Sequence, residues 1–532
     1  MAILLRDQAR VQLARSIYRD IYSNFDYYYL YIGKTTAWAD ESNPDIPVDN
    51  LVNISEQRRN ILFYKRVQTS DCVLLTRRID WESATVYDEY DNSYSSANPA
   101  NSGATTLSNA NFYVMTDSFN VYKCIENNKN SQSTVKPTST GTEIFELSDG
   151  YKWKFMFQIG AADRTKFLTD DYIPVRKVSG AGYPAFDING EIDEVIVTSG
   201  GSGYTAVPTV TIQGDGQGAS ANATVSAGAV TDVTVSTEGI GYSFAQAVFT
   251  GGGGTGAEAT VSLGSTDSAT LQSSVETTAV PGTIDRITVT SSGIDYADGD
   301  VAIEIDGDGT GAEASATLNN RGEITGVAIT APGQGYTFAD VSITQINGIG
   351  SGATFRAVIS PVYGHGSNPQ HELFAKNLGI TVSFVNDNKD YILDNDFRQV
   401  GIVKNIYQEG TTNLFTDNLG TPCHVIGVSN PDEYNYDDIL TTTENGKFMV
   451  VHKSDTNNDG TYDEIYLQQI KGGISASSII ENLTTGTEGL TINSVVSPEI
   501  DNISGEIIYF DNRRPVIRDE DQTETVKVIF TF

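Results

Sequence analysis

The stretch EVIVTSGGSGYTAVPTVTIQGDGQGASANATV (Glu194–Val225) is the first of four similar units, and this repetition decides the fold class. Each unit has a strand-like run, a motif close to G-x-G-Y, a second short run, a Gly-rich turn ending in Gly-Ala, and a run of small residues. The same order recurs in three further segments: Ile240–Val261, Ile294–Leu318 and Gln334–Val358. This composition predicts short strands joined by tight turns.

The tyrosines of the motif fix the register of the repeat. They lie 38, 54 and 40 residues apart along the chain, at Tyr204, Tyr242, Tyr296 and Tyr336. An insertion rich in Ser and Thr, near Gly264–Gly282, accounts for the longer interval. Glycine permits positive φ and close backbone approach, and one unit alone has too little apolar surface to fold. Neighbouring units are therefore expected to stack in a Gly-Tyr β-repeat module of four copies.

Strand patterns also flank the module. The chain begins with an amphipathic helix over Ile3–Tyr22, followed by β-branched and aromatic runs between Asn, Ser, Gly and Asp clusters. In Tyr151–Ile159, aromatic residues alternate with Lys, Met and Gln, which gives a strand one aromatic face to bury. We predict an all-β, multidomain protein of β-sandwich-like strands with an N-terminal helix and the inserted repeat module. The expected divisions are residues 1–180, 190–360 for the module, 361–410 with 503–532, and a second β insertion over 411–502.

Composition argues against several classes of partner. The chain has 34 Lys and Arg against 68 Asp and Glu, a formal net charge of −34, which repels phosphate backbones and anionic lipid. We expect no nucleic-acid partner, and no membrane insertion because no run approaches 18 apolar residues. The N-terminal run becomes charged after five residues, too soon for a signal peptide. Free buried thiols, formed in a reducing cytoplasm, are expected at the widely spaced Cys72, Cys124 and Cys423.

The sequence gives no support to catalysis. Strand-like runs follow the glycine runs GDGQGA and GDGTGA, and no Lys is placed as a phosphate loop requires. G-x-S-x-G is absent from the sequence, and the histidines are scattered at His365, His371, His424 and His452. Paired carboxylates are unavoidable among 68 acidic residues and carry no information without geometry. We therefore expect that the protein is not an enzyme. We assign it no cofactor apart from the candidate calcium ion described next.

One pattern indicates a metal site. DTNNDGTYDE matches the start of a calcium loop, in which alternate oxygen ligands surround a sharp Gly turn. The candidate calcium ligands are Asp455, Asn457, Asp459, Thr461 and Asp463. Position twelve is Tyr466 rather than Glu, and the flanks read as strands. The alternative is a hairpin with an Asn-Asp-Gly turn between the arms MVVHK and EIYLQQI, and both interpretations can hold together.

The two ends of the chain resemble a known family. GEIIYFDNRRPVIRDEDQTETVKVIFTF (Gly505–Phe532) closely resembles the C-terminus of the baseplate wedge protein encoded by gene eight of T-even-type phages. Five further segments are similar to that family in the same order: Tyr29–Glu41, Arg77–Trp81, Val121–Cys124, Ser148–Ile159 and Phe397–Ile406. The resemblance covers about residues 1–178, 361–408 and 503–532. The Gly-Tyr repeats and Gly410–Asn502 depart from the family and inherit nothing from it.

The resemblance implies a mostly β, two-domain fold, a homodimer in each wedge, and contacts to neighbouring wedge proteins of the same phage. It implies no catalytic residues. We therefore expect a structural baseplate wedge subunit of a contractile phage tail, assembled in the host cytoplasm and carried in the virion. Two alternatives stay open. One is a tail adhesin whose β-repeats bind a host surface glycan, and the other is a polysaccharide-cleaving spike enzyme.

Overall fold

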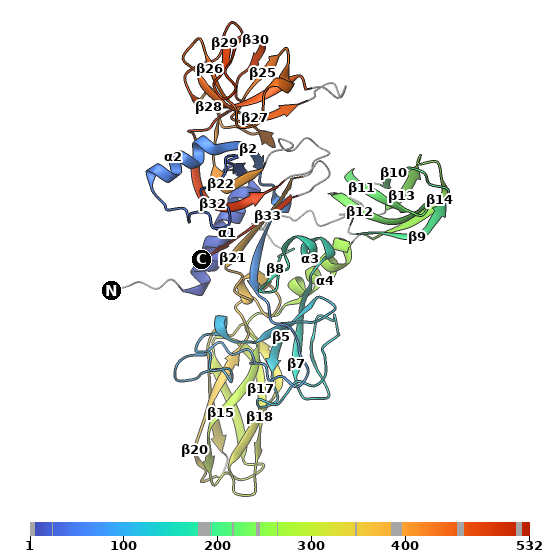
Figure 1. Ribbon diagram of the computed structural model, residues 1–532. Helices are drawn as coiled ribbons and strands as arrows, with labels where there is room; N and C mark the ends of the chain where they lie inside the picture. Colours follow the sequence, from blue (N-terminus) through green and yellow to red (C-terminus); the bar gives the residue numbers. More distant parts are fainter. Residues whose placement is uncertain are drawn as a thin grey trace. The chain divides into compact units, whose positions relative to one another are not determined.

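In the computed structural model, strands hold 49% of the described residues and helices 12%, which confirms the predicted all-β class. The structure describes residues 6–23, 25–178, 192, 194–214, 217–240, 245–262, 264–345, 348–384, 396–454, 462–517 and 524–532. The chain divides into two compact units (Figure 1). Unit 1 comprises Met1–Arg15, Val73–Leu378 and Phe530–Phe532, and unit 2 comprises Ser16–Cys72 and Gly379–Ile529.

Unit 2 contains a five-stranded antiparallel sheet whose strands are far apart in the sequence. Across the sheet they are β24 (Leu419–Gly420), β2 (Ile61–Arg66), β1 (Tyr28–Gly33), β22 (Phe397–Lys404) and β32 (Glu506–Val516). The central strand β1 is buried along its whole length. Its Tyr29 and Tyr31 meet Tyr64 of β2 edge to face, with ring centroids 6.5 and 6.3 Å apart, as the aromatic composition of the run favours.

A closed barrel of six strands forms the second part of unit 2, within the predicted insertion 411–502. Around the barrel the order is β25, β28, β27, β26, β29 and β30, and these strands are labelled in Figure 1. Their bounds are β25 (His424–Val428), β26 (Ile439–Thr442), β27 (Lys447–Ser454), β28 (Glu464–Lys471), β29 (Ile479–Asn482) and β30 (Thr487–Val496). Leu440, Phe448 and Leu467 are fully buried in its core. This segment therefore has a hydrophobic core of its own inside the barrel.

Unit 1 contains a second antiparallel sheet, built from the family-like part of the chain before residue 180. Its order is β4 (Tyr113–Met115), β5 (Asn120–Glu126), β7 (Lys152–Gln158) and β6 (Ile144–Glu146). The aromatic face of β7 is buried, with Trp153 in the core. The opposite face is also covered, because Lys154 and Met156 are buried. The alternation therefore located the strand but did not reveal that both faces are packed.

The remaining helices and strands are mostly short. Helix α1 (Asp7–Ser23) agrees with the predicted amphipathic helix, and buries Val11, Ala14, Tyr18 and Ile21 at three- and four-residue steps. The other helices are α2 (Leu51–Asn60), α3 (Ala161–Phe167), α4 (Gly264–Thr278) and α5 (Pro369–Glu372). Further strands are β3 (Cys72–Arg77), β8 (Tyr172–Val175), β21 (Asn377–Phe384), β23 (Tyr407–Gln408), β31 (Ile500–Asp501) and β33 (Glu524–Thr531). The prediction of buried thiols outside any disulfide is confirmed, since the three cysteines are buried and form no disulfide.

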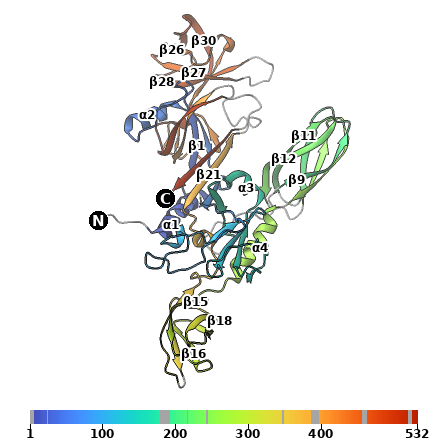
Figure 2. The same ribbon diagram turned by 60° about the horizontal axis from the view of Figure 1, so that its bottom comes forward.

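The four repeats fold as two lobes, each made from two repeats (Figures 1 and 2). The first lobe contains β9 (Glu194–Ser202), β10 (Thr209–Gly214), β11 (Gln217–Ser226), β12 (Ala229–Ile240), β13 (Ala245–Thr250) and β14 (Thr255–Ser262). The second lobe contains β15 (Ile284–Ile294), β16 (Val301–Gly307), β17 (Thr310–Leu318), β18 (Ile324–Gln334), β19 (Ala339–Gln345) and β20 (Ser351–Ile359).

Within a lobe, each repeat pairs with the other repeat along all three of its strands. The first strand of one repeat pairs with the last strand of its mate, as β9 does with β14 and β15 with β20. The middle strands pair with each other, β10 with β13 and β16 with β19. The two paired repeats of a lobe thereby bury Ile, Val and Ala side chains that a single repeat could not bury.

The recurring tyrosine joins the two repeats of a lobe. The N–H of Tyr336, in the fourth repeat, donates to the Gly282 carbonyl at 3.0 Å. Its ring lies against Gly309 of the third repeat, where an added Cβ would come within 2.3 Å of the ring carbon Cγ. The same pair of contacts is made by Tyr296 with Gly322 and Gly350, and by Tyr204 with Gly228 and Gly254. Tyr242 lies outside the described residues.

Helix α4 lies between the two lobes in the sequence, where a Ser- and Thr-rich insertion is predicted. Its Val275 is fully buried in the cluster around Trp153 of β7. Its Glu276 accepts a hydrogen bond from Lys177 Nζ at 3.1 Å, and both side chains are buried. The segment 190–360, predicted as one module, is thus two lobes with a helix between them that belongs to the core of the β4–β7 sheet.

Candidate functional site

The predicted calcium loop connects two strands of the barrel. Asp455, Asn457, Asp459 and Thr461 lie outside the described residues. The flanking strands β27 and β28 pair as the hairpin interpretation requires, with Ser454 opposite Glu464. Asp463, the last candidate ligand, donates its backbone N–H to the Ser454 carbonyl at 2.8 Å and closes the pairing. The hairpin arms are therefore confirmed, and calcium binding stays a prediction.

A polar hollow of about 780 Å³ lies beside the end of this hairpin. Four carboxylate residues line it: Asp432, Glu433, Asp463 and Glu464. Among the residues that the structure describes, no group of three or more His, Cys, Asp or Glu side chains is arranged to hold a metal ion. The hollow is thus an acidic surface whose charge favours cations in general.

Ionisable side chains of the types used in catalysis meet at one place in unit 1. Lys123 Nζ lies 2.8 Å from Glu372 Oε2, and His365 Nε2 lies 2.7 Å from Asp285 Oδ2. The Lys123 ammonium also sits 4.2 Å from the centre of the Tyr90 ring, which stands edge-on to His365. These side chains are almost completely enclosed. In this conformation the two pairs are therefore enclosed contacts within unit 1.

The protonation of this cluster follows from burial and pairing. Burial alone would raise the pKa of Glu372, but the charge and the hydrogen bond of Lys123 hold that pKa below its ordinary value. Burial lowers the pKa of Lys123 and of His365 despite their acidic partners. His365 is therefore neutral near pH 7, with its Nε2–H donating to Asp285. Sequence reasoning missed this cluster, although a lysine in the middle of the strand-like run VYKCI is a signal of a buried cation.

The two ends of the second lobe contact the rest of unit 1 close to the His365–Asp285 pair. Ser360 donates its N–H to the Thr283 carbonyl at 2.9 Å, which holds the two ends of the lobe together. Arg286 of β15 and Arg356 of β20 converge on Asp91, at 3.4 and 2.8 Å. Burial by itself would raise the pKa of Asp91, but hydrogen bonds from Ser93 and the two arginines hold it below its ordinary value. Ion pairs from the start of β15 and the end of β20 to Asp91 thus attach the second lobe to the rest of unit 1.

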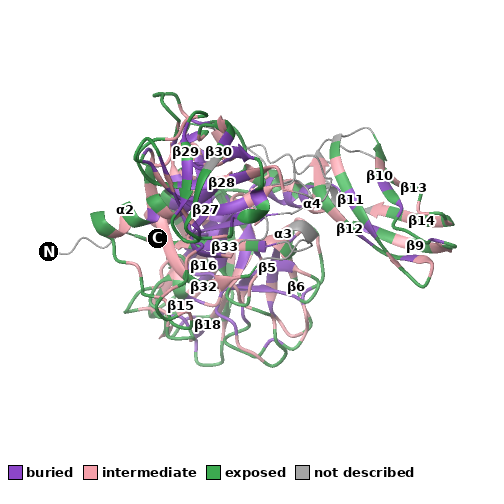
Figure 3. Cartoon of the chain, turned by 45° about the horizontal axis from the view of Figure 1, so that its top comes forward, coloured by how far each residue is buried: buried purple, intermediate pink, exposed green. Residues whose placement is uncertain are grey.

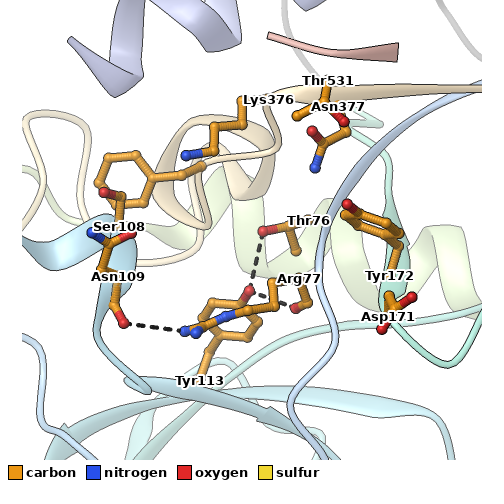
Figure 4. Close-up of a pocket in the computed structure, with 11 residues that line it drawn as sticks. Thr76, Arg77, Ser108, Asn109, Tyr113, Asp171, Tyr172, Lys376, Asn377 and Thr531 are labelled. Atoms are coloured by element: carbon orange, nitrogen blue, oxygen red, sulfur yellow. Dashed lines mark hydrogen bonds between the residues drawn. The ribbon is translucent and has the colours of Figure 1, made fainter. Parts of the chain in front are cut away.

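A shallow pocket of about 360 Å³ lies near the end of β3 (Figure 4). Its polar groups are largely engaged within the protein. The Tyr113 hydroxyl donates to the Arg77 carbonyl at 2.6 Å, and Arg77 Nη2 donates to the Asn109 carbonyl at 3.3 Å. Lys376 pairs with Asp7 at 3.0 Å. Lys376 is therefore already paired, and the Arg77 guanidinium is held by neutral oxygens of its own chain.

Segments that carry the family resemblance are neighbours in both sheets. In unit 2, β1, β22 and β32 are adjacent strands, with Leu30 opposite Ile402 and Ile402 opposite Tyr509. In unit 1, β5 and β7 pair directly, with Cys124 opposite Trp153. The two long segments without resemblance form the lobes and the barrel. They also contribute the edge strand β24 to the sheet of unit 2 and Val275 of α4 to the core around Trp153.

Comparison of the sequence with models of known protein families finds no match, and a search of curated proteins finds no match either. Among the described residues, no helix is both long and apolar enough to cross a membrane.

Proposed function

We propose that this chain is a structural subunit of the baseplate wedge of a contractile phage tail, and that its role is baseplate assembly. The observation that carries the proposal is the adjacency of β1, β22 and β32. Three segments that resemble the wedge family, though far apart in sequence, complete one sheet in register. Unrelated segments that resemble a family by chance have no reason to pair with one another.

The enclosure of the Lys123–Glu372 and His365–Asp285 pairs supports an assembly role over a catalytic one. In this proposal the protein is made in the host cytoplasm, binds other wedge proteins of the same phage, and stays in the virion. It forms a homodimer, which sedimentation at sub-micromolar concentration would detect as a species that persists on dilution.

The test is to locate the protein in the particle. Antibodies against the barrel, residues 424–496, should label the baseplate end of purified virions in electron micrographs. The isolated protein should bind wedge partners and should not bind host cells. Binding to cells without wedge binding would instead favour the adhesin, and release of sugar ends from host polysaccharide would favour the spike enzyme. Absence of the protein from purified virions would overturn the proposal.

A further inference from the structure

Helix α2 in unit 2 begins with a well-formed cap. The side chain of Asn50 accepts a hydrogen bond from the Asn53 N–H at 2.9 Å, which satisfies a donor of the first turn. The helix continues to Asn60, where the chain turns into β2. Its position is fixed by these ends and by the contacts of its inward face.

The inward face of α2 is mainly polar, although Ile54 on this side of the helix is half-buried. Gln57 is the buried residue of the helix, and its side chain bonds the Tyr31 hydroxyl at 3.3 Å and Asn512 Oδ1 at 3.1 Å. The Arg58 guanidinium donates to the backbone carbonyls of Ser504 and Gly505, the latter at 2.7 Å. Hydrogen bonds therefore hold this helix to its own protein where most surface helices use apolar side chains.

The apolar side chains of this region face the solvent instead. Leu51 and Val52, in the first turn of α2, are 82% and 65% exposed. Ile46 and Val48, in the loop that leads into the helix, are 88% and 59% exposed. Figure 3 colours the helix as exposed and intermediate along nearly all of its length. We name these four residues the α2 ridge.

The α2 ridge is unlike the scattered apolar residues that every protein surface carries. Four large aliphatic side chains lie within seven residues, two in the first turn of α2 and two in the loop before it, and the helix turns a mainly polar side inward. The fold gains nothing from their apolar character, because they make little contact with their own chain. A cluster of this kind is typical of a surface that becomes buried in an assembly.

Acidic side chains within the α2 ridge favour a partner protein with basic side chains. Asp45 and Asp49 alternate with its residues and are exposed, on a chain of net charge −34. A second copy docked here would bring the same carboxylates together, which is unfavourable. These two carboxylates therefore disfavour a homodimer through the α2 ridge. A different protein with an apolar groove and Lys or Arg at its rim would complement both the aliphatic and the acidic groups.

We propose that the α2 ridge docks into an apolar groove, rimmed by basic side chains, on another protein of the baseplate wedge. The identity of the partner class rests on the proposed function. The first test is the double variant Leu51→Gln, Val52→Thr, which keeps Asn50 and the inward face intact. Because both side chains are exposed, its melting temperature should equal that of the wild type, and its incorporation into wedges should fall at least tenfold.

A matched control is Val207→Thr in the first lobe, which also changes an exposed valine, one that is 60% exposed. This variant should assemble as the wild type does. Assembly of the double variant at the wild-type level would overturn the inference. A lower melting temperature of the double variant would do so as well, because it would mean that the ridge packs within its own chain.

The second test places the photocrosslinker benzoyl-phenylalanine at position 51 or 207 and irradiates purified virions. Crosslinks from position 51 should reach a different virion protein, at a segment with aliphatic and basic residues, and should exceed those from position 207. Crosslinks to a second copy, or equal yields from the two positions, would overturn the inference. Absence of the wild-type protein from virions is a separate result, and it refutes the proposed function itself.

Discussion

Replacement of Gly309 by alanine tests whether the contact of Tyr336 with the neighbouring repeat stabilises the second lobe. A Cβ at this position would lie 2.3 Å from Tyr336 Cγ and 2.6 Å from the Tyr336 backbone nitrogen. No real Cβ sits that close, so the ring and the turn must both move. Overpacking of this kind costs about 1–3 kcal/mol of unfolding free energy. For a domain of 60–100 residues, a loss of about 2 kcal/mol lowers Tm by about 8–16 °C.

The control for this variant is Gly326→Ala in the same lobe. An added Cβ at Gly326 meets nothing within 4 Å, so the substitution is sterically free. Both variants reduce the entropy of the unfolded chain, which stabilises each by about 0.4–1 kcal/mol. Calorimetry should therefore show a lower transition for Gly309→Ala and an unchanged or slightly raised one for Gly326→Ala. Equal transitions would refute the role assigned to the tyrosine.

Four further predictions follow from the buried charges, the lobes and the loop. Lys123→Met leaves Glu372 unpaired and buried, so denaturant unfolding should show a loss of about 3–5 kcal/mol, and a loss below about 1 kcal/mol would contradict the pairing. Because the pKa of His365 is depressed by burial, its stabilising effect is complete above its unfolded value of about 6.5 and is lost as pH falls from there. Wild-type protein should consequently lose more stability between pH 7.5 and 5.5 than His365→Asn does, whereas equal losses would exclude this titration. Replacing residues 194–262 with a short linker should leave a monodisperse, folded protein by gel filtration, whereas removal of the whole repeat segment takes α4 with it and should cause aggregation. Millimolar calcium should raise the melting temperature of the wild type relative to excess chelator, and less so for Asp459→Ala; calcium-independent curves would leave only a hairpin turn.

The local features of this protein could be predicted from the sequence because they depend on neighbouring residues. Turn glycines recur at fixed distances from a tyrosine, which is sufficient to find the repeats. Alternating and aromatic runs located β7 and β1, and the arms around the candidate calcium loop pair as a hairpin. Four of the five candidate ligands lie outside the described residues, so the metal site itself stays a prediction.

By itself, the sequence determined the all-β class, the repeat unit, the absence of a disulfide framework and the positions of many strands, since each depends on local composition and spacing. The tertiary structure alone decided which repeats pair, that Val275 of α4 enters the core around Trp153, and that Lys123 meets Glu372. It also decided that α2 turns Gln57 inward and Leu51 outward. Each of these depends on contacts between residues distant in the chain, where the free energy of burial and pairing overrides the pattern that neighbouring residues set.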